Sequence, residues 1–244
     1  LGAFDLSLVN ATPALDRVVA GLAERRRGTL CLHGPPGTGK TAFVRHLADQ
    51  LGTPLRAHRA SDLLDMYVGQ TEKRLAEAFA EAEREGAVLF LDEADSFLQR
   101  RSGAARSWEV TQVNELLVQI ESFGGIFACS TNLMESLDPA SLRRFALKIR
   151  FSPLTAAQRL TLFERTLGGA DSREGLPRPD DLTARLGRIP GLAAGDFAAV
   201  VRRARILGLE LDAEGLLAEL LDECRYKDRD GDGRVAVGFG RGEG

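Results

Sequence analysis

No apolar stretch of the sequence approaches the roughly 20 residues that a membrane-spanning helix requires, so we expect no membrane segment in this chain. The first ten residues also lack the basic start and the apolar core of a secretory signal. Neither sign of charge dominates, because the formal net charge is −3 and the arginines are spread along the chain. Non-specific nucleic-acid binding usually requires a basic patch, and we therefore expect no nucleic-acid partner.

Cysteine and histidine are both scarce. The three cysteines lie far apart, and Cys31 and Cys129 fall inside apolar runs, where a free cysteine behaves as a small hydrophobic residue. This pattern favours a reducing compartment over a disulfide framework, so we expect a cytoplasmic protein. The three histidines lack the spacing of metal ligands, which argues against a metal–histidine site.

Predicted strands alternate with predicted helices over the first 152 residues. This alternation predicts an α/β fold, a three-layer αβα core with a mostly parallel sheet. The strands are expected at residues 29–33, 55–57, 87–91, 125–130 and 148–151, the last of which would close the sheet. The main helices are expected at residues 13–26, with Thr12 as N-cap and Pro13 as first residue, and at 41–51, 70–85 and 108–123.

The pattern changes after Pro153, where strand-like runs end and helical patterns follow one another. Thr155 and Gln158 form a capping box, which predicts a helix that ends near Leu167. Further helices are expected at residues 181–186, 196–207 and 212–225. We therefore expect an α/β domain over residues 1–152, a small helical domain over 153–226 and a loose tail over 227–244.

One segment matches the phosphate-binding P-loop pattern G-x-x-x-x-G-K-[ST]. It consists of Gly34, Pro35, Pro36, Gly37, Thr38, Gly39, Lys40 and Thr41. The glycines let backbone N–H groups face phosphate oxygens. Lys40 would reach the β- and γ-phosphates of ATP, and the hydroxyl of Thr41 would bind Mg²⁺. The alternative is a chance glycine-rich turn, but the segment lies between a predicted strand and a predicted helix, as the motif requires.

Two carboxylates end the continuous apolar strand predicted at residues 87–91. Asp92 and Glu93 follow it directly, and ligands of open α/β sheets bind at the carboxyl ends of the strands. Asp92 would hold Mg²⁺, and Glu93 would act as general base or orient the water that attacks the γ-phosphate. The alternative is a surface acidic pair, which the P-loop in the same sequence disfavours.

Several motifs together resemble the AAA clade of the AAA+ ATPases, over about residues 4–210. Besides the P-loop they are L-D-E-A-D at 91–95, S-T-N at 130–132, L-D-P-A at 137–140 and R-R-F at 143–145. The resemblance implies that Asn132 is sensor 1, which helps to place the attacking water. It also implies that Arg143 and Arg144 are arginine fingers, although Ala146 stands where many members carry aspartate.

An arginine finger reaches the γ-phosphate bound to a neighbouring subunit. Supplied in this way, an arginine can accelerate phosphoryl transfer on the order of 10³-fold or more. The resemblance therefore implies a ring of like subunits, with a hexamer as the family expectation. The alternative for either arginine is an ordinary ion pair with an acid.

A short segment, Met66, Tyr67, Val68 and Gly69, precedes the helix predicted at residues 70–85. In AAA members that thread polypeptides, an aromatic–aliphatic–glycine loop at this place lines the central pore. The resemblance thus implies a loop that grips a protein substrate, and aromatic contacts suit chains of any sequence. The alternative is core packing of Met66 and Tyr67. The arginine-rich stretch 100–106 lies where a second pore loop would be, or it is a solvated charged loop.

Two further segments carry weaker signals. The segment A-G-D at residues 194–196 resembles the second sensor region of the AAA clade, which implies that the backbone near Gly195, with residues 8–10, contacts adenine. Residues 228–233 copy the front half of an EF-hand loop. Phe239 replaces the bidentate glutamate of that loop, which argues against a Ca²⁺ site.

The leading functional prediction is an ATPase that remodels a protein partner of unknown identity through a central pore. A nucleotide-dependent assembly switch that docks a partner without threading it is the first alternative. A DNA-handling loader ATPase is the second, and the acidic balance and the R-R-F segment both argue against it.

Overall fold

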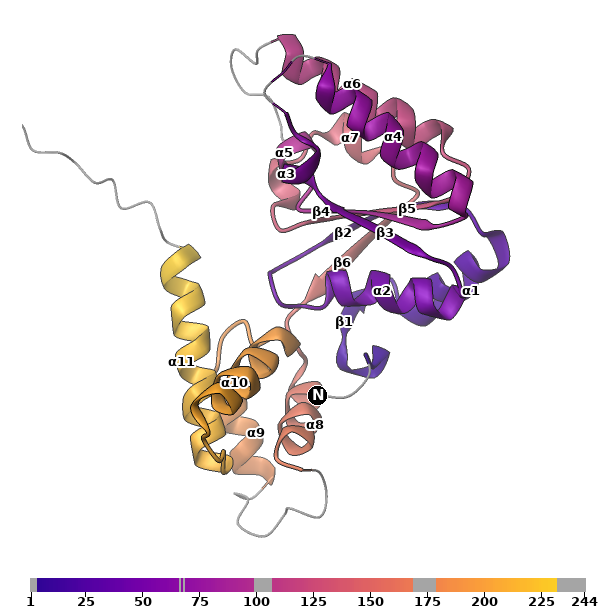
Figure 1. Ribbon diagram of the computed structural model, residues 1–244. Helices are drawn as coiled ribbons and strands as arrows, with labels where there is room; N and C mark the ends of the chain where they lie inside the picture. The colour runs from indigo at the N-terminus through magenta and orange to yellow at the C-terminus, as the bar shows by residue number, and fades with distance from the viewer. Residues whose placement is uncertain (1–3, 66, 68, 99–106, 169–178, 232–244) are drawn as a thin grey trace, which may run out of the picture. The chain divides into compact units, whose positions relative to one another are not determined.

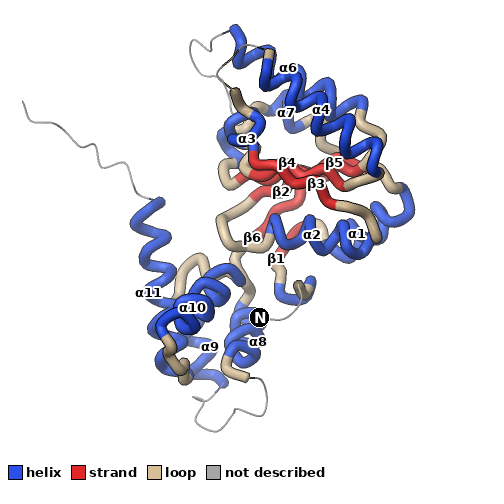
Figure 2. The backbone as a smooth tube through the Cα atoms, viewed as in Figure 1, coloured by secondary structure: helices blue, strands red, loops and turns tan. Residues whose placement is uncertain are grey.

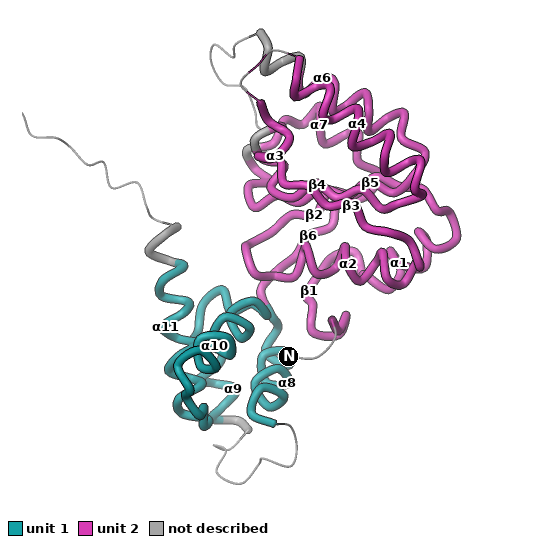
Figure 3. Tube along the Cα trace, in the orientation of Figure 1, with its two compact units in different colours: residues 1, 154–244 teal, residues 2–153 magenta. Residues whose placement is uncertain are grey.

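The computed structural model describes residues 4–65, 67, 69–98, 107–168 and 179–231 (Figure 1). By its internal contacts the chain divides into two compact units (Figure 3). The larger unit comprises residues 2–153, and the smaller unit comprises residues 154–244 together with residue 1.

The larger unit is built around a six-stranded sheet with the order β1-β6-β2-β5-β4-β3. Its strands are β1 (Asn10–Thr12), β2 (Gly28–His33), β3 (Leu55–Arg59), β4 (Val88–Asp92), β5 (Ile126–Thr131) and β6 (Leu147–Ser152). Neighbouring strands pair in parallel, except that β1 runs antiparallel to β6. The predicted α/β fold with a mostly parallel sheet is confirmed.

Helices cover both faces of this sheet (Figure 2). One face carries α1 (Leu15–Arg25) and α2 (Lys40–Leu51). The other carries α3 (Ala60–Leu63), α4 (Gln70–Glu85), α5 (Asp95–Leu98), α6 (Ser107–Ser122) and α7 (Pro139–Leu142). All six residues of β5 are buried, because a central strand of such a sheet has helices above and below it.

The start of the larger unit differs from the sequence-based expectation. Thr12, which we expected as the N-cap of the first helix, is the last residue of β1 and pairs with Arg150 of β6. The helix α1 therefore begins at Leu15 rather than Pro13, and no side chain caps it. The strand expected to close the sheet, β6, lies instead between β1 and β2. Both errors have one cause, since the pairing of β1 with a distant strand leaves no local pattern.

Four helices form the described part of the smaller unit: α8 (Ala156–Thr166), α9 (Pro179–Gly187), α10 (Ala194–Leu207) and α11 (Ala213–Gly231). The predicted capping box is present at α8, where the backbone N–H of Thr155 donates to Gln158 Oε1 at 3.0 Å and that of Gln158 donates to Thr155 Oγ1 at 3.3 Å. Arg159 joins α8 to the end of α9 by donating to the carbonyl oxygens of Leu186 and Ile189, each at 2.8 Å.

A buried acid organises the start of α10. The carboxylate of Asp196 accepts the backbone N–H of Ala193 at 2.8 Å and forms an ion pair with Lys227 of α11. Because α11 continues to Gly231, the first residues of the segment expected as a loose tail are helical. Residues 232–244 lie outside the described part of the chain.

Candidate active site

The loop between β2 and α2 carries its glycines in backbone conformations that other residues rarely adopt. The φ angle is +138° at Gly34, +76° at Gly37 and +101° at Gly39. At Gly34 a Cβ atom would also lie 2.0 Å from the carbonyl oxygen of Phe151. This position therefore requires glycine for its conformation and for the close approach of β6. Gly39 precedes α2 directly, which leaves the N–H groups of the first helical turn available to a phosphate.

Lys40 lies folded back onto this loop and is only 8% exposed. Its Nζ donates to two carbonyl oxygens of the loop, at 2.7 and 2.9 Å, and to Oδ1 of Asn132 at 2.8 Å. Burial lowers the pKa of Lys40 to about 8, while the nearby carboxylates of Asp92 and Asp95 act to raise it. A bound phosphate would favour the charged form that burial disfavours.

Thr41 and Asp92 provide two oxygen donors close together. Thr41 Oγ1 donates to Asp92 Oδ2 at 3.0 Å. Mg²⁺ prefers oxygen ligands and is commonly bound through one or two carboxylates together with the phosphates of its substrate. The residues present therefore fit Mg²⁺ held between Thr41, Asp92 and a nucleotide. Among the described residues no group of three or more His, Cys, Asp and Glu side chains could hold a metal ion.

Glu93 adopts a left-handed backbone conformation, with φ of +56°, which is uncommon for a residue other than glycine. Its backbone N–H donates to Oγ of Ser130 at 3.1 Å and to Asp92 Oδ1 at 3.2 Å. The hydroxyl of Ser130 in turn donates to Asp92 Oδ1. The side chain of Glu93 is exposed, so its carboxylate is free to meet a water molecule at the end of β4.

Asn132 directly follows β5, and hydrogen bonds brace the chain on either side of it. The hydroxyl of Thr131 donates to Asp95 and accepts the backbone N–H of Leu133 at 2.9 Å. Together with the bond from Lys40, these contacts hold the Asn132 amide beside the P-loop. The carboxyl ends of β2, β4 and β5 thus bring the P-loop, the acids Asp92 and Glu93, and Asn132 to one edge of the sheet.

The two candidate finger arginines, between α7 and β6, differ in their surroundings. Both side chains are exposed. Arg144 forms an ion pair with Glu121 of α6, and its carbonyl oxygen accepts the hydroxyl of Thr29 at 3.0 Å. For Arg143 no side-chain hydrogen bond or ion pair is found within the described residues. The alternative that we considered for either arginine, an ordinary ion pair with an acid, therefore applies to Arg144.

Tyr67 lies on the loop before α4 with 71% of its surface exposed. Core packing, the alternative explanation for this residue, is therefore wrong. Its backbone N–H donates to Asp65 Oδ1 at 3.0 Å, and the same carboxylate pairs with Arg74 of α4 at 2.6 Å. Gly69, with φ of +85°, leads into α4. The base of the loop is thus fixed while the aromatic ring is exposed.

The remaining predicted residues lie elsewhere. Met66, Val68 and the stretch 100–106 are outside the described residues. Gly195 lies in the first turn of α10, in the smaller unit. Residues 228–231, which begin the EF-hand-like pattern, form the helical end of α11 rather than a loop.

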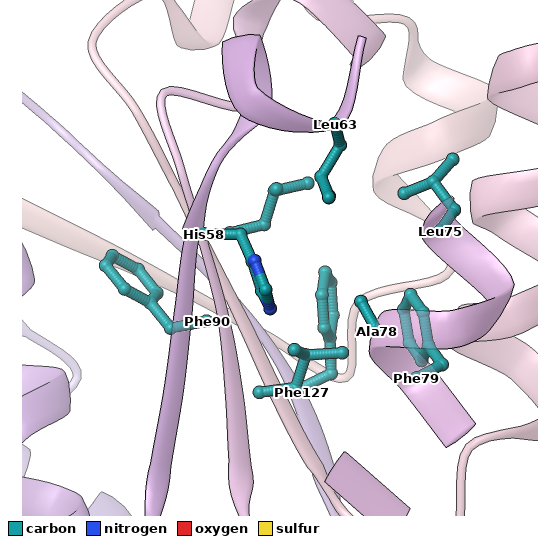
Figure 4. Close-up of a pocket in the computed structure, with 9 residues that line it drawn as sticks. His58, Leu63, Leu75, Ala78, Phe79, Phe90 and Phe127 are labelled. Carbon is teal, nitrogen blue, oxygen red and sulfur yellow. The ribbon is translucent and has the colours of Figure 1, made fainter. Parts of the chain in front are cut away.

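A small hollow beside the edge strand β3 is a poor candidate for a ligand site (Figure 4). The His58 ring points into it near Ala78 and Phe127. Its other lining residues are apolar, and the space of about 10 Å³ is that of about one water molecule.

Sequence reasoning missed the residues that hold the site rather than form it. They are Asp95, Ser130 and Thr131 around the acids and Asn132, and Glu121 beside Arg144. The first three lie within the L-D-E-A-D and S-T-N segments. Their position at the carboxyl ends of two neighbouring strands was the signal that could have identified them.

Comparisons with known proteins point to one family. Residues 30–153 match the model of the ATPase family associated with various cellular activities (AAA). The chain is 32% identical over 211 residues to the ATP-dependent zinc metalloprotease FtsH 3 of Sphaerobacter thermophilus, covering 83% of this chain and 42% of that protein. It is 32% identical to FtsH of Corynebacterium glutamicum, covering 81% of this chain and 24% of that protein.

A plant relative is named a probable inactive ATP-dependent zinc metalloprotease, FTSHI 1 of Arabidopsis thaliana. It is 28% identical, with 86% of this chain and 24% of that protein covered. The chain thus spans less than half the length of these relatives. In the part of the chain that the structure describes, no helix is long and apolar enough to cross a membrane. The family match and the relatives together show that this chain belongs to the AAA family of ATPases, enzymes that hydrolyse ATP with Mg²⁺.

Proposed function

We propose that this ATPase works in a ring of like subunits, with six as the expected number, and uses ATP hydrolysis to remodel or unfold a protein drawn through a central pore. Tyr67 would grip the passing chain. The observation that carries this proposal is the exposed aromatic ring on a loop whose base is fixed by Asp65 and Arg74. The relatives' names, which describe ATP-dependent metalloproteases, favour a protein as the substrate.

The site residues would divide the chemistry among them. The P-loop backbone and Lys40 bind and orient the phosphates of ATP, and Thr41 with Asp92 holds Mg²⁺, which neutralises charge on the β- and γ-phosphates. Glu93 accepts a proton from the attacking water or orients it, and Asn132 positions that water. Hydrolysis of this kind is mainly positioning and charge stabilisation, so the bonds that fix these groups matter as much as the groups themselves.

An arginine from the neighbouring subunit would complete each site. Arg143 is the better candidate because its exposed side chain has no partner among the residues described, whereas Arg144 is paired with Glu121. A guanidinium without an internal partner can reach an anion on another subunit without first breaking an ion pair.

For the smaller unit we propose the role of a lid. Its backbone near Gly195 would contact the adenine ring. The bonds of Asp196 to Ala193 and Lys227 support this role, because they fix the first turn of α10.

The pore proposal is tested with the chain's two tyrosines. Tyr67→Ala should abolish stimulation of ATP hydrolysis by a protein substrate and slow unfolding of a fluorescent protein with an unstructured tail by at least about tenfold. Tyr226→Ala removes the other tyrosine, which is 57% exposed on α11, and should leave both unchanged. Both variants are compared with the unaltered chain in the same assembled state.

Unchanged unfolding by Tyr67→Ala would exclude the gripping role. If partner release then still followed hydrolysis, the assembly switch would be the better description. If Tyr67→Ala and Tyr226→Ala lost the stimulation of ATP hydrolysis by substrate to the same extent, that result would also count against a specific role of Tyr67.

A further inference from the structure

We propose that Ser130 is a positioning residue that fixes both Asp92 and Glu93 for hydrolysis. This inference rests on the proposed roles of these two acids. Ser130 contacts neither phosphate nor water in that scheme, and would act through its hydroxyl alone. Three features of the larger unit support it.

The first feature is the rigidity of its location. Ser130 is 2% exposed and lies on β5, which pairs with β2 on one side and β4 on the other. Its partner in the β2 register is Leu32, two residues before the P-loop begins. The hydroxyl is therefore attached to an interior strand that is bonded on both sides.

The second feature is the orientation of the Asp92 carboxylate. Ser130 donates to Oδ1 and Thr41 donates to Oδ2, so hydroxyls on two separate elements each hold one oxygen. With both contacts the carboxylate plane cannot rotate. Without Ser130, the contacts from Thr41 and from the backbone N–H of Glu93 would remain, and Thr41 is itself expected to turn toward Mg²⁺ when nucleotide binds.

The third feature is the left-handed backbone of Glu93. A non-glycine residue keeps such a conformation only where its surroundings impose it. The N–H of Glu93 is held by Ser130 Oγ at 3.1 Å and by its neighbour Asp92 at 3.2 Å. Because Ser130 also holds Asp92, its hydroxyl determines both bonds. Removing it releases the backbone turn that directs the Glu93 carboxylate.

The test is Ser130→Ala, measured as kcat, KM and nucleotide affinity together with the midpoint of thermal unfolding. We expect kcat to fall about tenfold, in the range of one lost hydrogen bond to a charged group. KM and the Kd for a fluorescent ATP analogue should stay within about twofold, because the P-loop is untouched. A purely structural role would lower affinity and thermal stability while leaving the kcat of the folded fraction unchanged.

Ser122→Ala is the matched control, since among the described residues that hydroxyl bonds only to backbone carbonyls of its own helix, at 3.0 and 3.2 Å. It should behave as the unaltered chain. The inference would be overturned if the kcat of Ser130→Ala stayed within twofold of that of the unaltered chain. It would also be overturned if the substitution weakened nucleotide affinity, raised KM and lowered the midpoint of thermal unfolding together.

Glu93→Gln separates this inference from the proposed function. If Glu93→Gln keeps full turnover, the role proposed for Glu93 itself fails. If Glu93→Gln abolishes turnover while Ser130→Ala has the normal kcat, only the role of Ser130 fails.

Discussion

Lys40 Nζ donates a hydrogen bond of 2.8 Å to the amide oxygen of Asn132, joining the start of α2 to the end of β5. The P-loop lysine and the residue expected to place the attacking water are therefore in direct contact. A change in the charge of Lys40 would therefore alter its hydrogen bond to Asn132. The protonation state of this lysine thus affects both phosphate binding and the position of Asn132.

The first prediction concerns the pH dependence of nucleotide binding. Burial lowers the pKa of Lys40 from 10.5 to about 8, and a bound phosphate would raise it again. Above pH 8 the site must therefore take up a proton to bind ATP, and affinity should fall with rising pH by up to about tenfold per unit. Below pH 8 Lys40 is already charged, so the affinity for ATP should no longer change with pH through this group.

Titration calorimetry in two buffers of different ionisation enthalpy would measure the proton uptake at pH 9. Lys73→Met, which removes an exposed lysine on α4, should retain the uptake, whereas Lys40→Met should lose it along with most of the affinity. Equal proton uptake in the Lys40→Met variant would assign the effect to another group.

The second prediction compares two glycines. Gly34→Ala places a Cβ 2.0 Å from the Phe151 carbonyl oxygen at a φ of +138°, and should cost about 3 kcal/mol or more of unfolding free energy or displace the P-loop. Gly21→Ala adds a Cβ within α1 that meets nothing within 4 Å, and should stabilise by about 0.5–1 kcal/mol. Urea unfolding and nucleotide affinity measure both changes.

Nucleotide affinity should be lost in Gly34→Ala and unchanged in Gly21→Ala. A Gly34→Ala variant with normal stability and normal affinity would mean that β6 and the P-loop separate easily, contrary to their close approach.

The third prediction concerns completion of the site between subunits. Arg143→Ala should lower ATP turnover on the order of 10³-fold, and Glu93→Gln should abolish it. Mixed in one assembly, the two variants should regain activity, because a site with intact Glu93 can face an intact Arg143 on the neighbouring subunit. Turnover as a function of the mixing ratio is the measurement.

Arg144→Ala should lower turnover much less than Arg143→Ala, since its exposed pair with Glu121 is worth about 0–1 kcal/mol. Glu121→Gln serves as its control and should resemble it. If Arg144→Ala instead causes the larger loss and shows the complementation, the two assignments must be exchanged. No complementation by either variant would argue that one subunit supplies its own site.

The order of helices and strands in the larger unit was largely readable from the sequence, because apolar strands buried on both sides and the P-loop carry local patterns. Residues 70–85 were predicted as a helix and form α4. The short strand β1 was not, because its pairing partner β6 lies at the other end of the unit.

The candidate site likewise contains residues that the sequence could predict and contacts that it could not. The P-loop, Asp92 and Glu93 could be predicted as site residues because motifs mark them. The left-handed turn at Glu93 and the contacts of Ser130 could not, since they depend on the register that brings the ends of β4 and β5 together. The Arg144–Glu121 pair likewise joins elements that no sequence spacing relates.

The position of β6 has a mechanical consequence. This strand ends at Ser152, immediately before the chain leaves the larger unit at Pro153. It is bonded on both sides, to β1 and to β2. Tension applied to the chain at that junction pulls along β6 and loads two ladders in shear, so that their hydrogen bonds must yield together, whereas an edge strand pulled in the same way would be held by a single ladder. Since Leu30 to His33 of β2 pair directly with β6, part of any such force reaches the strand that ends in the P-loop.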